Sequence, residues 1–158
     1  MATPKVLILP GWRGSGHSHW QMCWVRRYAY QLVEQHDWMR PLRGDWLARL
    51  EDVMSDLNEP VYLVAHGLGC IQIAAWAQIS AQSHKVHGAL LVAPSDVEAS
   101  HFQDVLSSWR PIELKALPFK SILIGPTRRM DSCSLGLTRL STVLTRVINS
   151  SILKGFET

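Results

Sequence analysis

Short apolar runs alternate with longer stretches of helical periodicity along this chain. Four of the runs have the length and composition of buried strands, at residues 6–9, 61–65, 89–93 and 121–124. A weaker run at 30–33 predicts a short edge strand. Continuous apolar runs of this length, separated by helical segments, are typical of parallel strands covered on both faces. The pattern therefore predicts β-α-β units, an α/β fold and a mostly parallel sheet.

The helical segments are predicted from apolar residues that recur every three or four positions. The clearest helix covers 46–57, and two more are predicted over 18–28 and 68–81. The apolar stripe of the clearest helix consists of Trp46, Leu47, Leu50, Val53, Met54 and Leu57. Trp76 lies in an apolar run inside the third helix and is predicted to be core.

Two later segments are less regular. The S-x-x-E pattern that begins at Ser95 is a capping box and predicts a further helix running toward Trp109. The apolar positions within 135–147 fit one more helix or strand. Since no linker or internal repeat divides the chain, we expect a single domain over 1–158, in which 126–158 is a divergent tail.

Composition places the chain among soluble globular proteins, with 158 residues of which 47% are hydrophobic and 18% charged. Its three cysteines, Cys23, Cys70 and Cys133, are far apart and include no C-x-x-C pair, so we expect no disulfide framework, no metal and no cofactor. The run at 6–10 is too short for a signal peptide, and no run approaches the roughly 20 apolar residues that cross a bilayer. A cytoplasmic protein is the expectation.

The net charge of +3 is unevenly distributed. Residues 120–158 hold six Lys or Arg against two Asp or Glu, whereas 1–119 hold 10 against 11. One interpretation of this basic tail is a patch for nucleic acid or an acidic membrane. We favour a solvated tail, because it lacks interleaved aromatic residues and any nucleic-acid-binding signature. The expected partners therefore include neither nucleic acid nor a membrane.

The sequence VYLVAHGLGCI at 61–71 has the layout of a nucleophile elbow. In that motif, G-x-S-x-G, a strained turn from strand to helix lifts a serine hydroxyl out of the sheet. Here the position of the nucleophile is Gly67. The setting of a serine hydrolase is present, but the reacting atom is missing.

Five stretches occur in order along the chain with related spacing. They are VLILPGWRGSGHSHW at 6–20, DWMRPLRGDW at 37–46, VYLVAHGLGC at 61–70, GALLVAPSDVE at 88–98 and LPFKSILI at 117–124. Together they resemble the small serine hydrolases of the family of retinoblastoma-binding protein 9 and the bacterial YdeN-like proteins. The resemblance implies a three-layer α/β/α hydrolase-like fold, here with an abbreviated C-terminal strand and helix. It also implies hydrolysis of carboxyl esters or amides by a Ser-Asp-His triad, through an acyl-enzyme.

The three triad positions that the resemblance implies are all altered in this chain. The nucleophile falls on Gly67, where no acyl-enzyme can form because glycine has no side chain. The acid falls on Met130, and Asp131 could substitute for it only if the loop shifts. The base falls on Val147, and no histidine follows His101.

The oxyanion hole that the resemblance implies consists of backbone groups, so the loss of side chains does not remove it. It uses the N–H of Leu68 and an N–H from the loop Gly11, Trp12 and Arg13. We expect a small ester, amide or carboxylate ligand to bind there, with Trp12 and Trp38 as walls.

Other polar side chains near the elbow have structural interpretations. His66 is predicted to be a hydrogen-bonded residue beside the elbow rather than the triad base. Cys70 lies one turn into the following helix and is predicted to point into packing. His17 and His19 are predicted to be solvated, with a place at the mouth of the site as the alternative.

Three functions remain open. The first is a family member that has lost its activity, as a pseudoenzyme or as a decayed gene product with a damaged C-terminus. The second is a ligand- or protein-binding module that reuses the oxyanion pocket; no L-x-C-x-E motif points to a retinoblastoma-type partner. The third is an active hydrolase with another constellation, such as Asp131 with His66. Three altered triad positions favour the first.

Overall fold

The computed structural model describes residues 3–102 and 104–125. These residues form a sheet in the order β2-β1-β3-β4-β5, in which all neighbouring strands are parallel. The strands are β1 (Lys5–Leu9), β2 (Gln31–Leu32), β3 (Val61–His66), β4 (Val86–Val92) and β5 (Ser121–Ile124). All five predicted strands are thus confirmed, and β2 lies at the edge as expected.

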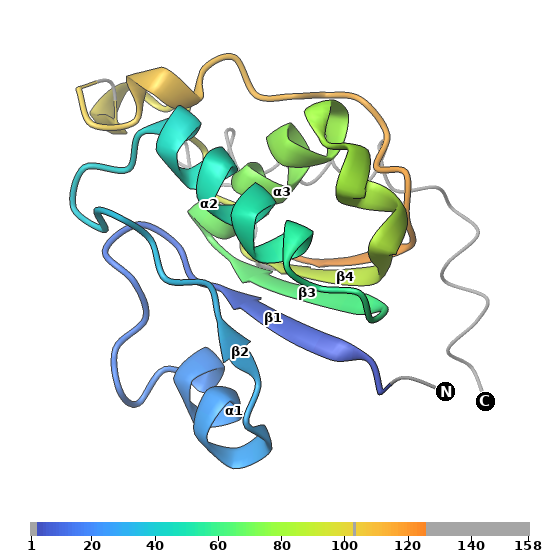
Figure 1. Cartoon of the computed structure of the whole chain (residues 1–158). Coiled ribbons are helices and arrows are strands. Elements are labelled where there is room, and N and C mark those ends of the chain that lie inside the picture. The colour runs from blue at the N-terminus through green and yellow to red at the C-terminus, as the bar shows by residue number, and fades with distance from the viewer. Residues whose placement is uncertain (1–2, 103, 126–158) are drawn as a thin grey trace.

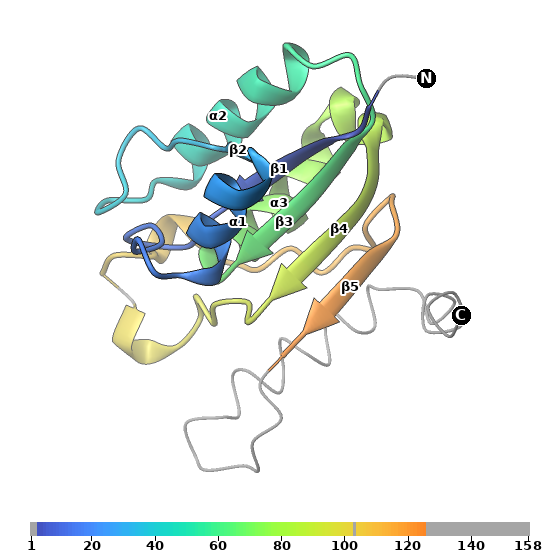
Figure 2. The same cartoon turned by 90° about the horizontal axis from the view of Figure 1, so that it is seen from below.

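Helices cover the two faces of the sheet, as Figures 1 and 2 show. The helices α2 and α3 lie on one face, and α1 lies on the other. They comprise α1 (Trp20–Tyr28), α2 (Arg43–Ser55) and α3 (Leu68–Ile79). Three short 3-10 helices follow, at Ala81–Lys85, Ser100–Phe102 and Ser107–Trp109. The arrangement is the predicted three-layer α/β/α fold.

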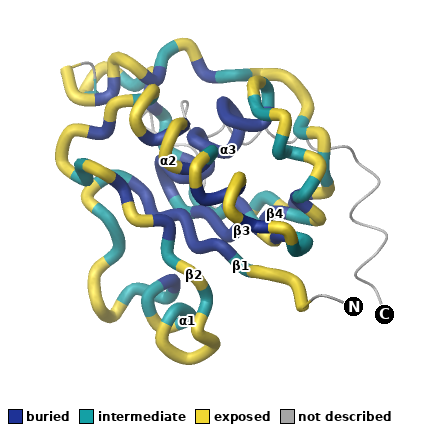
Figure 3. Tube along the Cα trace, viewed as in Figure 1, coloured by how far each residue is buried: buried dark blue, intermediate teal, exposed yellow. Residues whose placement is uncertain are grey.

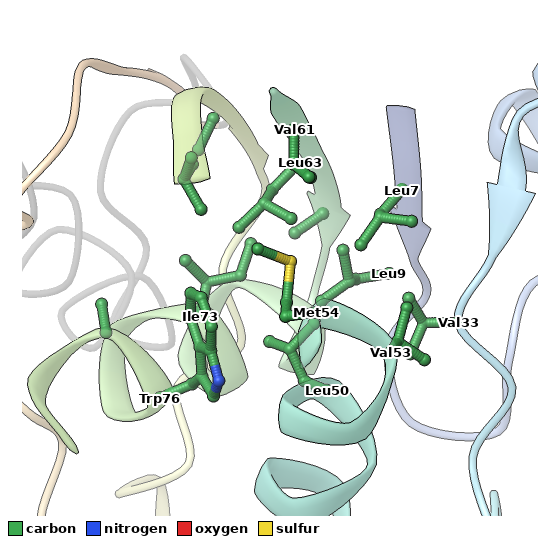
Figure 4. Close-up of a cluster of buried hydrophobic side chains, with 14 of the residues drawn as sticks. Leu7, Leu9, Val33, Leu50, Val53, Met54, Val61, Leu63, Ile73 and Trp76 are labelled. Atoms are coloured by element: carbon green, nitrogen blue, oxygen red, sulfur yellow. The ribbon is translucent and has the colours of Figure 1, made fainter. Parts of the chain in front are cut away.

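The main core lies between the sheet and the pair α2 and α3. Alternate residues of the central strands, such as Leu7 and Leu63, face the apolar stripe of α2 and the buried side of α3 (Figure 4). Trp76 is 1% exposed within this core, which confirms its predicted place. Figure 3 shows that β1, β3 and most of α3 are buried, whereas α1 is largely open to solvent.

Helix α3 lies unusually close to the end of β1, and Gly69 makes this possible. A Cβ atom at this position would lie 2.3 Å from the backbone oxygen of Leu9. No side chain, even a methyl group, fits such a gap without moving the backbone. Gly69 therefore fixes the distance between the helix that follows the elbow and the strand that precedes the first loop.

The helix predicted from Ser95 toward Trp109 is wrong. In a capping box, the glutamate side chain accepts from the backbone N–H of the first residue. Here the Ser95 N–H donates to Gly67 O at 3.2 Å, and the carboxylate of Glu98 accepts from Ile112 N instead. Since both partners of the box are engaged elsewhere, the segment folds as turns and the 3-10 helices Ser100–Phe102 and Ser107–Trp109.

A second hydrophobic cluster joins this irregular segment to the helices. Its fully buried members include two tryptophans, Trp46 of α2 and Trp109, whose rings pack edge to face with centroids 5.7 Å apart. Leu68, the first residue of α3, belongs to the same cluster. The cluster therefore packs around Leu68, the residue that follows the elbow glycine.

Several expectations lie outside the described residues. The segment 135–147 and the candidate acid and base positions, Asp131 and Val147, belong to this part of the chain. Within the described residues, no helix has both the length and the apolar character to span a membrane. The same residues contain no group of three or more His, Cys, Asp or Glu side chains placed to hold a metal ion.

Candidate functional site

The turn at Gly67 has the backbone conformation of an elbow. Gly67 joins β3 to α3 with φ +57° and ψ −122°, a combination that side-chain-bearing residues adopt only under strain. Its N–H donates to Val92 O at 3.1 Å, and its carbonyl accepts from Ser95 N at 3.2 Å. Val92 at the end of β4 and Ser95 in the turn that follows thus hold both polar groups of this glycine, and the turn is fixed without any side chain of its own.

The loop after β1 meets the elbow at very short range. A Cβ atom on Gly11 would lie 3.1 Å from both His66 O and Leu68 N. The amide of Leu68 is the first of α3, so it has no acceptor within the helix, and Gly67 supplies no side-chain cap. The predicted association of the Leu68 N–H with the loop that contains Gly11 is therefore present in the fold.

The structure removes one predicted oxyanion donor. The Arg13 N–H donates to Trp38 O at 3.1 Å, so it is already paired and does not face a ligand. Gly14 N–H is likewise paired, with Gly11 O at 3.0 Å. Among the described residues, no acceptor pairs with the amide of Trp12. The second donor that the resemblance implies would therefore come from Trp12 or Gly11, whose N–H also has no acceptor among the described residues, rather than from Arg13.

The loops that carry Trp12 and Trp38 lie side by side, and both residues are half-buried. The Trp12 indole donates to Met39 O at 3.1 Å, and its ring meets Phe102 edge to face with centroids 5.9 Å apart. The guanidinium of Arg13 lies 4.4 Å from the centre of the Trp12 ring. These contacts hold the Trp12 ring in place. Both tryptophans pack against the second hydrophobic cluster, to which Leu68 belongs. Their role as walls of a ligand site stays a prediction.

The turn that carries Trp38 is held by a carboxylate. The side chain of Asp37 accepts from Met39 N at 2.8 Å and Arg40 N at 2.9 Å. These two backbone N–H groups stabilise the charged form and lower the pKa of Asp37. The position of Trp38 is therefore set by local backbone geometry rather than by the elbow.

His66 lies beside the elbow but points toward the α1 side of the sheet. Its half-buried ring packs against His19, with centroids 4.8 Å apart, and against Trp20 at 6.4 Å. Burial lowers the pKa of His66, and the neighbouring His19 lowers it further. The predicted hydrogen bond of its ring is absent among the described residues, where aromatic contacts take its place.

The two other loop histidines have separate roles. The ring of His19 accepts from Gln21 N at 3.3 Å and so caps α1, and burial lowers its pKa. His17 is exposed, and its ring lies 3.3 Å from the guanidinium of Arg26. His17 is therefore solvated as predicted, whereas His19 is a helix cap that contacts His66.

Cys70 is completely buried, as predicted. Its thiol lies 3.5 Å from Val92 O, and burial strongly raises its pKa. A reactive cysteine needs a lowered pKa and access to solvent. Cys70 is therefore a packing residue and does not replace the missing nucleophile.

Sequence reasoning missed one polar side chain at the elbow, the hydroxyl of Ser95. A Cβ atom on Gly67 would lie 3.3 Å from Ser95 Oγ. The signal was available, since Ser95 follows β4, and β4 neighbours β3 in a parallel sheet. The residues after adjacent parallel strands meet at one edge of the sheet. The capping-box interpretation assigned Ser95 to a helix instead.

Comparison with known proteins decides the family. A family model described as "Serine hydrolase" matches residues 6–131. The chain belongs to the serine hydrolase family. The resemblance seen in the sequence is thereby confirmed, and the elbow, the loop after β1 and the turn at Ser95 all lie within the matched region.

A curated relative is YdeN of Bacillus subtilis (strain 168), which is named as a hydrolase. It is 29% identical over 97 residues, which is 58% of this chain and 50% of YdeN. The match thus spans about half the length of that relative. What the whole relative does is therefore only a guide to this chain.

Two solved structures share the fold. A YdeN-like hydrolase from Pectobacterium atrosepticum has a TM-score of 0.71 and 20% identity, covering 91% of this chain and 72% of its own. The ydeN gene product of B. subtilis has a TM-score of 0.55 and 20% identity, covering 86% and 82%. Both confirm the α/β hydrolase-like architecture.

Proposed function

We propose that this serine hydrolase family member is catalytically impaired or inactive, because its nucleophile position holds a glycine. The observation that carries the proposal is Gly67, which has the φ and ψ of an elbow but no atom able to attack a carbonyl carbon. Turnover through an acyl-enzyme needs such an atom, together with a base that activates it and then the water that removes the acyl group. The sequence offers Val147 at the base position and Asp131 beside the acid position.

Residual acceleration of ester hydrolysis would come from the backbone alone. Serine hydrolases without their triad retain roughly 10³–10⁴-fold acceleration over water, through the oxyanion hole and substrate binding. A working triad adds several further orders of magnitude, so turnover by this chain is expected to be negligible beside that of an active relative.

A second candidate function is a binding module for a small ester, amide or carboxylate. It is favoured by the amide of Leu68 at the start of α3 and by that of Trp12 in the adjoining loop, neither of which has an acceptor among the described residues. Donors of this kind bind a partly negative oxygen whether or not a nucleophile is present. Trp12 and Trp38 pack against the cluster that contains Leu68, and in this proposal their rings form the walls of the site. Nucleic acid, a membrane and a cofactor have no part in this proposal.

Steady-state hydrolysis of p-nitrophenyl acetate tests the first proposal. We expect no sustained release of p-nitrophenol above the buffer rate after the first equivalent. Gly67→Ser is measured beside the parent chain. Silence in both is expected, because the base position is also altered. Sustained turnover by the parent chain would overturn the proposal, since it would require another working nucleophile.

Tryptophan fluorescence tests the binding module. Acetate, propionate and butyrate are titrated to millimolar concentration, with sodium chloride at the same ionic strength as the control. We expect a saturable change that is reduced in Trp12→Phe and kept in Trp24→Phe, because Trp24 belongs to α1 on the other face of the sheet. A flat response of the parent chain would contradict a carboxylate site.

A further inference from the structure

A hydroxyl group from another part of the chain, the turn after β4, lies at the elbow. Ser95 lies in the turn after β4, yet its Oγ is 3.3 Å from the point where a Cβ of residue 67 would be. A serine at position 67 would place its own hydroxyl one bond beyond that point. The hydroxyl of Ser95 thus lies next to the position that the family's nucleophile would occupy.

The backbone on each side of Ser95 holds the hydroxyl there. The Ser95 N–H donates to Gly67 O at 3.2 Å, and its carbonyl accepts from Val97 N at 3.2 Å. Two residues earlier, Ala93 adopts φ +46°, and its N–H donates to Ile124 O at 2.7 Å. A non-glycine residue with positive φ is uncommon and persists only where its surroundings fix it. The turn is therefore anchored to β5 at its start and to the elbow at Ser95.

Ser95 also keeps part of its surface exposed to solvent, since it is half-buried rather than enclosed. By contrast, the other nucleophile near the elbow, the thiol of Cys70, is fully buried. An ester whose carbonyl oxygen accepts from the Leu68 N–H would lie beside Gly67, and Ser95 Oγ is 3.3 Å from the point where a Cβ of residue 67 would be. Backbone donors at that position stabilise the negative oxygen that develops during acyl transfer.

We propose that Ser95 is an acyl acceptor that stands in for the lost elbow serine, and that it reacts once with an activated ester. Ser95 Oγ bonds to the carbonyl carbon, the bond from that carbon to the leaving oxygen breaks, and p-nitrophenolate departs. The hydroxyl proton passes to bulk water. Because the described residues place no base on Ser95 Oγ, the acyl group is not removed, and the reaction stops after one equivalent.

This inference rests on the proposed loss of turnover, and the two can fail separately. The full chain is incubated with excess p-nitrophenyl acetate and quenched in acid. The number of acetyl groups is then read from the intact mass and their positions from a peptide digest. Hydroxylamine treatment distinguishes acetyl esters on serine, which it cleaves, from acetyl amides on lysine or the N-terminus. Release of p-nitrophenol is followed in the same sample.

The matched control is Ser83, another half-buried serine, in the 3-10 helix that precedes β4 at the far end of the sheet. We expect hydroxylamine-sensitive acetylation of Ser95 at least about tenfold above that of Ser83, because one oxyanion donor is worth roughly 10²–10³ in rate. Ser95→Ala should lose this ester, and Ser83→Ala should keep it. Mapping on the unmodified chain needs no variant, so it decides the proposal even if Ser95→Ala fails to fold.

Acetylation confined to amines, or equal on Ser95 and Ser83, would overturn the assignment of Ser95. Sustained release of p-nitrophenol would overturn the proposed loss of turnover. In that case the peptide map still decides whether Ser95 carries the acyl group.

Discussion

The elbow and the core beneath α3 lie within three turns of one helix and are built in opposite ways. At the elbow, Gly67 is held by its own N–H and carbonyl, and the neighbouring loop approaches through another glycine. In the core, Trp76 and Ile73 are fixed by side-chain volume against the sheet. The backbone geometry of the elbow can therefore persist without a catalytic side chain, whereas the core depends on its side chains.

The largest effect is expected where side-chain volume dominates. Trp76→Ala removes a side chain that is 1% exposed and donates to the Glu51 carboxylate at 2.7 Å. Truncating a buried tryptophan typically costs about 3–5 kcal/mol of unfolding free energy, through lost burial and the cavity left behind. Urea denaturation followed by circular dichroism measures it. Trp76→Phe keeps most of the volume and should cost much less; equal losses for both would show that the hydrogen bond, not packing, is decisive.

The next largest effect is expected at Gly69, where the two regions meet. In Gly69→Ala, the new methyl group would lie 2.3 Å from Leu9 O. Alanine favours a helix by about 1 kcal/mol over glycine, but forcing α3 away from β1 should cost roughly 3 kcal/mol, the upper end for overpacking. We therefore expect net destabilisation in urea. Gly44→Ala, in α2 with open space around its Cα, is the control and should not destabilise the chain.

A smaller effect is expected at the elbow itself. Gly67→Ala forces a side-chain-bearing residue to adopt φ +57° and brings its Cβ to 3.3 Å from Ser95 Oγ. A strained backbone of this kind costs about 1–3 kcal/mol. Measuring the same substitution in a Ser95→Gly background separates the two causes. The loss should shrink but persist there, and its disappearance would mean that the contact, rather than the dihedral angles, carries the strain.

The smallest effect is a pH dependence on the α1 side of the elbow. Burial lowers the pKa of His66 in the folded chain, so the unfolded chain binds a proton more readily below about pH 6.5. The stability that neutral His66 contributes is complete above that value and is lost as the pH falls. His19, whose pKa is also lowered, acts in the same direction. Urea unfolding between pH 5 and 8 should show a slope that His66→Gln reduces; an unchanged slope would assign it to other groups.

The sequence was sufficient for the regular elements and for the elbow. Continuous apolar runs identified four of the strands, because both faces of a parallel sheet are covered, and a weaker run identified the edge strand β2. Gly67 and Gly69, on either side of Leu68, identified the turn. The positive φ of Gly67 and the close approach of Leu9 O to Gly69 both exclude a side chain. Family resemblance then predicted that oxyanion donors lie in the loop after β1, and the pairing of Arg13 with Trp38 shows that the motif alone does not identify which amide of that loop is free to donate.

The segment after β4 could not be predicted, because its backbone is fixed by partners distant in sequence. The Ser95 N–H donates to Gly67 O, and the Glu98 carboxylate accepts from Ile112 N. These two long-range hydrogen bonds form in place of the local capping box. The position of His66 was uncertain for a similar reason. Its ring packs against His19, and nothing in the strand pattern reveals which side chains of the first loop lie on that face.

The most direct test of the account is to observe the backbone donors themselves. Amide chemical shifts are followed by NMR while acetate is added, with chloride at equal ionic strength as the control. The account predicts saturable shifts of the Leu68 and Trp12 amides, and none at Arg13, whose N–H is already paired. Shifts confined to surface lysine neighbours, with Leu68 and Trp12 unaffected, would contradict the claim that the oxyanion site outlives its nucleophile.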